Sequence, residues 1–197
     1  MRRLLHVGCG PQNKWSLKGF ATHEWEEVRL DIAAGVKPDI IGKLTDMGAA
    51  PRRSFDAVFS AHNIEHVFAH EVPLALGEFH RVLKRDGFAV VTCPDLQTVC
   101  ERVATTGLLE PLYVSPMGPI AALDVMYGHR PSIAAGNVYM AHKCGFTLPS
   151  LTACLREAGF KSVHGVRRIE AFELWAIACK EALSQPRMTE IAQAFFP

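Results

Sequence analysis

Two glycines, Gly8 and Gly10, end an apolar run near the start of the chain and give it the residue types of a ligand-binding loop. Glycine has no Cβ atom, so a ligand can lie directly against the main chain. Asp31 ends a second apolar stretch about 20 residues later, the distance at which a strand-helix-strand unit presents a carboxylate to ribose hydroxyls. Together these residues predict a cofactor site at the carboxyl ends of two strands.

Histidines supply candidate general bases, because the pKa of histidine lies near neutral pH. His62 follows a buried apolar run, and His142 lies in a glycine- and proline-rich segment expected to cover a substrate. We expect His142 to be the base, since a substrate-specific group belongs in that segment, and His62 is the second candidate. The expected substrate contacts are His66, Tyr127, His129, Tyr139 and Lys143.

A metal site is the alternative use of the residues near His62. His62, Glu65 and His66 are metal-ligating types, and a helix would place both histidines on one face. No further ligand follows at the spacing of a known metal motif. We therefore expect no metal.

Strands and helices alternate along the first half of the chain. Strands are predicted at 4–7, 28–32, 38–44, 55–60 and 88–93, with an amphipathic helix at 70–84. The stretch 13–27 has no helical period, so the first connecting helix is expected to be short or missing. Arg85-Asp86-Gly87 is expected to end the amphipathic helix, with Gly87 in the left-handed conformation. This alternation predicts a mostly parallel α/β sheet with helices on both faces.

The segment at about 96–146 departs from that pattern. It begins as a predicted helix and then carries repeated glycine and proline, which is typical of irregular loops that cover a binding site. A helix capped near Thr147 is expected to end at Gly159, and two strands at 161–169 and 171–180 are close enough to form an antiparallel hairpin at a sheet edge. The tail at 184–197 carries a short apolar stripe that is expected to dock on the body.

Composition narrows the class of protein. A chain of 197 residues is expected to form a single domain, 1–197. The 21 basic and 20 acidic side chains nearly balance, which gives no support for a nucleic-acid partner. Six unpaired-looking cysteines without a C-x-x-C motif, and no signal or membrane-spanning stretch, predict a cytoplasmic protein that does not enter membranes. Nothing in the sequence indicates a homodimer.

Four segments together are specific for a known superfamily: HVGCGPQ, RLDI, SFDAVFSAHNIEHV and EFHRVLKRDGFAVVTCPDL. On these segments the sequence resembles the class I S-adenosylmethionine-dependent methyltransferases, especially the type 11 group. MYG and the later AHKCGFTLPSLTACLREAGF are similar to the ending of a bacterial subset linked to sugar or surface-polysaccharide modification. The resemblance implies a Rossmann-like, seven-stranded sheet with an antiparallel last strand and methyl transfer to a small-molecule acceptor, with a sugar or polysaccharide hydroxyl as one candidate.

The resemblance also implies roles for individual residues. S-adenosylmethionine would lie across the strand ends, with its methionine portion against the glycine loop, Asp31 on the ribose and Leu44 near the adenine. The full expected cofactor set is Gly8, Cys9, Gly10, Pro11, Asp31, Leu44, Ser60, Ala61 and His62. For this chemistry no metal is implied.

Three residues depart from the family pattern. His6 stands where an acid is common, Gln12 replaces a third glycine, and Lys43 stands where an acceptor for the adenine amino group is common, a role that Asp46 could take instead. These departures leave two alternatives open. One is a catalytically degenerate methyltransferase-like binding protein, and the other is a nicotinamide-dependent oxidoreductase, which the missing G-x-G-x-x-G pattern disfavours.

Overall fold

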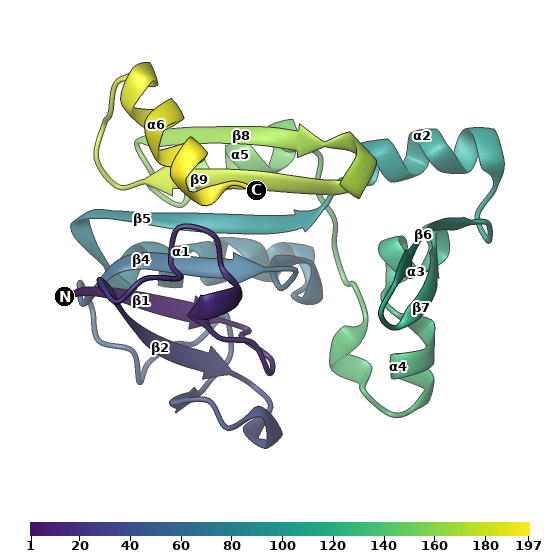
Figure 1. Ribbon diagram of the computed structural model, residues 1–197, viewed down its shortest axis with the longest axis horizontal. Helices are drawn as coiled ribbons and strands as arrows, with labels where there is room; N and C mark the ends of the chain where they lie inside the picture. Colours follow the sequence, from purple (N-terminus) through teal and green to yellow (C-terminus); the bar gives the residue numbers. More distant parts are fainter.

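A seven-stranded sheet forms the centre of the computed structural model, which describes residues 1–197 (Figure 1). Its strands stand in the order β3-β2-β1-β4-β5-β9-β8, and β9 is antiparallel to both of its neighbours while the remaining pairs are parallel. The strands are β1 (Arg2–Val7), β2 (Trp25–Asp31), β3 (Ile40–Ile41), β4 (Phe55–Ala61), β5 (Leu83–Pro94), β8 (Ser162–Arg168) and β9 (Glu173–Cys179). The predicted fold class, a mostly parallel sheet with an antiparallel last strand, is confirmed.

The order of the strands reverses at β1. From β1 the chain moves outward to β2 and β3, and it then returns to place β4 on the other side of β1. In open α/β sheets such a reversal leaves a crevice at the carboxyl ends of the strands, because the two connections leave in opposite directions. The glycine loop begins where β1 ends, so it lies at this crevice.

The two faces of the sheet are covered differently (Figure 1). Helices α1 (Val72–Val82) and α5 (Leu148–Glu157) pack on one face around a cluster of 24 buried residues that includes Phe79 and Leu155. On the other face, α6 (Gln185–Phe195) covers a second cluster of 13 residues together with the segment 17–25. Between β1 and β2 the structure has only a single 3-10 turn, Lys14–Ser16, as the absence of a helical period predicted.

The end of α1 differs from the prediction. The helix ends at Val82, and Leu83 already pairs with Phe55 of β4, so the residues around Gly87 belong to β5. The conformation of Gly87 is not left-handed. Instead, a Cβ atom there would lie 3.2 Å from the Asp56 carbonyl oxygen and 3.0 Å from Leu83 Cδ2. A side chain at this position would crowd these neighbours, which favours glycine here.

The segment 96–146 is more regular than its composition predicted. It contains α2 (Leu96–Thr106), a hairpin of β6 (Pro111–Ser115) and β7 (Gly118–Ala121), α3 (Ala122–Tyr127), α4 (Arg130–Ala134) and a 3-10 turn at Val138–Met140. The expectation of an irregular loop was wrong because its glycines mark the ends of short elements: Gly107 and Gly128 cap α2 and α3 with positive φ, and Gly118 turns the hairpin. In Figure 1 these elements extend beyond the carboxyl ends of β1, β4 and β5.

The carboxyl-terminal elements agree with the sequence. Thr147 caps α5, and Gly159 follows its end with φ +102°. β8 and β9 form the predicted hairpin at the sheet edge, and α6 buries Met188 and Phe195. None of the helices has the length and apolar character needed to cross a bilayer.

Candidate functional site

A cavity of about 560 Å³ opens at the carboxyl ends of β1, β2 and β4. It is bordered on the sheet side by the glycine loop and the ends of β2 and β4, and on the other side by residues of the 96–146 segment. Ten of the predicted site residues line it: Gly8, Gly10, Pro11, Asp31, Leu44, Ala61, His62, His66, Tyr139 and Lys143. The crevice that the sheet topology creates is therefore an actual cavity with the predicted loop at its wall.

The two glycines of the loop are required for different reasons. Both have positive φ, +61° at Gly8 and +53° at Gly10. A Cβ atom at Gly8 would lie 1.9 Å from Asn63 Oδ1, so the space beside Gly8 is filled by a side chain. Nothing lies within 4 Å of a Cβ atom at Gly10, where the backbone faces the cavity. Gly10 is therefore the glycine that leaves room for a ligand.

Asn63 ties the loop to the end of β4. Its Nδ2 donates to the carbonyl oxygens of Val7 at 3.1 Å and Ala61 at 2.7 Å, so one side chain joins the ends of β1 and β4. Asn63 was not among the predicted site residues. Its contact with Gly8 is made across 55 residues of chain, and no local pattern indicates it.

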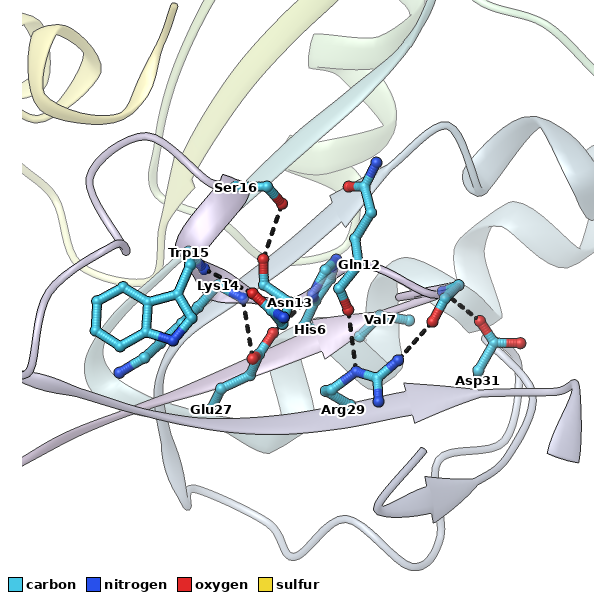
Figure 2. Close-up of polar contacts among 12 residues, drawn as sticks. His6, Val7, Gln12, Asn13, Lys14, Trp15, Ser16, Glu27, Arg29 and Asp31 are labelled. Atoms are coloured by element: carbon cyan, nitrogen blue, oxygen red, sulfur yellow. Dashed lines mark hydrogen bonds and ion pairs between the residues drawn. The ribbon is translucent and has the colours of Figure 1, made fainter. Parts of the chain in front are cut away.

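One face of β2 holds the glycine loop in place (Figure 2). Arg29 donates from Nε to the Gln12 carbonyl oxygen at 3.0 Å and from Nη2 to the Gly10 carbonyl oxygen at 2.6 Å. Asp31 Oδ2 accepts from the Gly10 amide at 2.8 Å. Residues two apart in a strand share a face, so Glu27, Arg29 and Asp31 all point toward the loop. Charged residues alternate with apolar ones along this strand, and that pattern is the sequence signal for the role of Arg29. Arg29 was not among the predicted site residues.

His6 stands where the family commonly has an acid. A carboxylate nevertheless lies beside it, supplied by Glu27 of the neighbouring strand β2. His6 is 2% exposed, and its Nδ1 donates to Glu27 Oε1 at 2.8 Å (Figure 2). Burial lowers the pKa of His6, although Glu27 opposes this effect, so the ring is neutral at pH 7. Glu27 Oε2 also accepts from the Lys14 amide at 2.9 Å. Glu27 thus anchors the outgoing end of the loop.

Asp31 retains capacity to accept further hydrogen bonds. Each of its oxygens accepts one backbone amide, Gly10 at Oδ2 and Ala33 at Oδ1, both at 2.8 Å. An ionised carboxylate has about four acceptor positions, so about two are left toward the cavity. Lys43 and Leu44 line the adjacent wall. Asp46 does not line the cavity, and its Oδ1 accepts from the Gly48 amide, so the structure does not support it as the acceptor that replaces Lys43.

His62 stands at the end of β4 with φ +51°, a conformation that is unfavourable for a residue other than glycine. Its ring faces two carboxylates, with Nε2 3.4 Å from Glu173 Oε2 and Nδ1 3.4 Å from Glu65 Oε1. Desolvation alone would lower the pKa of His62, but the two carboxylates outweigh it and raise the pKa to about 10. A ring in this state is a cation and a hydrogen-bond donor at neutral pH.

The rings of His66 and His142 lie next to each other. Their ring centroids are 4.8 Å apart, His66 borders the cavity, and His142 lies behind it. His142 Nδ1 donates to the Val125 carbonyl oxygen at 2.8 Å. Burial lowers the pKa of His142, so its other ring nitrogen carries a lone pair at pH 7.

Four predicted site residues lie away from the cavity. Cys9 of the glycine loop and Ser60 of β4 are both buried, and neither borders the cavity. Tyr127 is exposed at the end of α3, and His129 pairs with Ser132 at 2.7 Å. The structure instead brings Asn137, Met140 and Phe68 to the cavity, none of which has a chemical signature in the sequence.

The chain is similar to known proteins in part of its sequence and in its fold. Residues 5–91 match the model of a family described as a methyltransferase domain. No curated protein sequence matches the chain significantly.

Similar solved structures share the fold at low sequence identity. A SAM-dependent methyltransferase from Archaeoglobus fulgidus has 16% identity and a TM-score of 0.54, with 91% of this chain and 86% of that chain covered. Burkholderia thailandensis 1,6-didemethyltoxoflavin-N1-methyltransferase has 15% identity and a TM-score of 0.53, with 91% and 71% covered. A "possible exported protein" from Bordetella parapertussis has 16% identity and a TM-score of 0.55, and the chain spans 92% of itself but only 62% of that protein. These findings confirm the predicted fold and the predicted resemblance.

Proposed function

From the match of residues 5–91 to a methyltransferase domain, we propose that this protein binds S-adenosylmethionine and transfers its methyl group to a small-molecule acceptor. The observation that carries the proposal is that the Gly10 backbone and the Asp31 carboxylate face one cavity at the carboxyl ends of β1 and β2. The Burkholderia relative was solved with S-adenosylhomocysteine and a small-molecule substrate.

The residues present fit this cofactor. The cavity, at about 560 Å³, is within the usual range of about 300–1,000 Å³ for small-molecule sites. Gly10 leaves open space against the backbone for the methionine portion, and Asp31 has acceptor positions for the ribose hydroxyls. Leu44 offers an apolar wall for the adenine, and Ala61 and His62 border the side where the acceptor would enter.

S-adenosylmethionine supplies a methyl group that positively charged sulfur already activates. The protein then has to position the two reactants and, for a hydroxyl acceptor, to activate the nucleophile. We place acceptor binding at His66, Tyr139 and Lys143, which border the cavity. His142, the expected base, does not border the cavity, so we propose that it acts on the acceptor through His66, whose ring centroid lies 4.8 Å from that of His142.

A sugar or polysaccharide hydroxyl is the acceptor that we propose. The wall formed by His66, Tyr139 and Lys143 offers both donors and acceptors, which suits a polyhydroxylated molecule. We also propose a cytoplasmic setting, because all six cysteines are free, as expected in a reducing compartment.

Calorimetry with S-adenosylhomocysteine tests the proposal. The unchanged protein should bind one equivalent, and Asp31→Asn should weaken binding about tenfold to a hundredfold, because hydrogen bonds to a charged group contribute about 1.5–3 kcal/mol. Asp86→Asn, an exposed aspartate far from the cavity, is the matched control and should not change the affinity.

The absence of both heat and thermal stabilisation with millimolar ligand would refute cofactor binding. If the ligand binds but no sugar in a broad panel is methylated, the protein is better described as the binding protein without catalysis. Equal affinities for the unchanged protein and Asp31→Asn would move the ribose contact to another residue.

A further inference from the structure

Three metal-ligating side chains meet at the side of the cavity that His66 borders. Glu65, His66 and His142 each offer a donor atom, and these atoms all lie within 4.8 Å of one another. The sequence offered no further ligand at a motif-like spacing, because His142 comes from the distant 96–146 segment. We propose that Glu65, His66 and His142 form a binding site for a divalent first-row transition metal ion.

The Glu65 carboxylate is buried, and its oxygens accept no hydrogen bond. Its residue is 1% exposed, and neither oxygen accepts a hydrogen bond from any group in the protein. His62 Nδ1 lies 3.4 Å from Oε1, an ion-pair distance without hydrogen-bond geometry. The charge of His62 offsets part of the charge of this carboxylate, and a bound metal ion would supply the direct partners that its oxygens lack.

Both histidines use one ring nitrogen in a hydrogen bond to a backbone carbonyl oxygen. His66 Nδ1 donates to the Ala141 carbonyl oxygen at 3.1 Å, and His142 Nδ1 donates to the Val125 carbonyl oxygen at 2.8 Å. These bonds fix the tautomer and leave each Nε2 with its lone pair. Metal-binding histidines almost always donate their second ring N–H in this way.

The backbone holds the three ligands together without help from an ion. The amides of Lys143 and Cys144 both donate to the Glu65 carbonyl oxygen, at 2.8 and 3.3 Å, and the His142 amide donates to the Tyr127 carbonyl oxygen at 3.1 Å. These bonds clamp the residues around His142 onto the turn that carries Glu65. Because the ligands are already held close together, less conformational entropy is lost when a metal ion binds.

The donor set indicates the class of metal. Two imidazoles and one carboxylate suit zinc, manganese, iron, cobalt or nickel, whereas magnesium and calcium prefer oxygen ligands. Metal–ligand bonds of about 2.1 Å place donor atoms about 3.4 Å apart in a tetrahedral site, so small side-chain rotations would bring these donor atoms, which lie within 4.8 Å of one another, to metal-binding distance. Three protein ligands leave at least one position open, as in catalytic rather than structural sites.

A role for the ion follows only if the proposed methyltransferase function holds. An acceptor hydroxyl that occupies the open position would have its pKa lowered, and its proton would pass to water. The oxygen would then form a bond to the methyl carbon as the bond from carbon to sulfur breaks, and both electrons of that bond would neutralise the sulfonium. The metal keeps its charge throughout. His142 would then act as a ligand and not as a proton acceptor.

Cobalt binding tests the site directly. The full chain, stripped with a chelator, is titrated with Co²⁺ and followed by visible absorption, and Zn²⁺ is then added in competition. The unchanged protein should bind one equivalent. Glu65→Gln and His142→Gln should each weaken binding at least tenfold, and both are included because either one alone could disturb folding. His70→Gln, an exposed histidine close in sequence to Glu65, is the matched control and should bind as tightly as the unchanged protein.

Two outcomes would overturn the site: no saturable binding of one equivalent, or equal affinity in the control and in both ligand variants that remain folded. S-adenosylhomocysteine binding is measured on the same samples and should be retained in both ligand variants. Cobalt binding without S-adenosylhomocysteine binding would refute the proposed function and leave the metal site standing. Methyl transfer at full rate after chelation would refute the catalytic role of the ion.

Discussion

Replacing Arg29 by methionine tests whether the face of β2 orders the cofactor loop from behind. Arg29 does not line the cavity, yet its guanidinium donates to four carbonyl oxygens. Two of these belong to Gly10 and Gln12 of the glycine loop, and two belong to Val36 and Lys37 after β2. Methionine retains most of the apolar stem and removes every donor.

The size of the effect can be estimated from these four bonds. Hydrogen bonds to a charged group contribute about 1.5–3 kcal/mol when the partner would otherwise be buried and unpaired. Water can reach the freed carbonyl oxygens here, because Arg29 is partly exposed, so about 0.5–1 kcal/mol for each bond is a better scale. The four bonds then amount to about 2–4 kcal/mol of folding stability. The two bonds to the glycine loop account for about 1–2 kcal/mol of this total. In the variant, that much of the binding free energy of the ligand would be used to order the loop.

Two measurements follow from this estimate. Calorimetry should show S-adenosylhomocysteine binding about fivefold to thirtyfold weaker in Arg29→Met, since 1.4 kcal/mol corresponds to a factor of ten. Thermal unfolding should begin lower by about 5–15 °C, at about 2–4 °C for each kcal/mol in a chain of this size. Arg2→Met is the control, because Arg2 pairs with Glu24 at the exposed surface and contacts nothing in the loop.

An unchanged affinity in Arg29→Met, in a protein that has lost stability, would refute the reasoning. It would mean that the loop is ordered by Asn63 and Asp31 alone. A weaker affinity in Arg2→Met would show that the effect comes from the loss of positive charge and not from the hydrogen bonds.

Two other predictions concern stability. Gly8→Ala should destabilise the protein more than Gly10→Ala, measured by urea unfolding, because its Cβ would lie 1.9 Å from Asn63 Oδ1 whereas Gly10 has open space; equal losses would contradict this packing. The contacts of Arg130 hold the pKa of Asp124 at about 2, below the ordinary 3.8, so the contribution of Asp124 is complete above the unfolded pKa and is lost as the pH falls through about 2. The stability difference between the unchanged protein and Asp124→Asn should therefore be smaller at pH 3 than at pH 6, and a difference that grows in acid would refute the assignment.

The sequence predicted those parts of the fold that depend on local patterns. The apolar runs around Val7, Val58 and Val90 became adjacent parallel strands, and Gly159 ended a helix as its position indicated. The end of α1 was predicted wrongly because Arg85-Asp86-Gly87 is a helix stop in local terms. Strand pairing between Phe55 and Leu83 overrides that preference.

The site was predictable where function depends on backbone and strand ends, and not where it depends on contacts between distant segments. Gly10 and Asp31 face the cavity because the loop and the end of β2 must both lie at the crevice. No pattern in the sequence connects His142 to Glu65, since their meeting depends on how the 96–146 segment folds back. His6 was predicted to be a departure from the family pattern because no acid precedes the glycine loop. Its carboxylate partner, Glu27, comes from the neighbouring strand, and the sequence around His6 does not indicate this contact.

The packing of α6 has a consequence for how the chain folds during synthesis. Phe195 contacts Phe20 and Phe88, with ring centroids 4.6 and 4.9 Å apart, and a Cβ atom at Gly19 would lie 2.4 Å from its ring. At about 5–20 residues per second, the ribosome delivers Phe195 on the order of 10–30 s after Phe20. One face of the sheet therefore stays uncovered on the nascent chain for that interval. That face is where a chaperone would find apolar surface for longest.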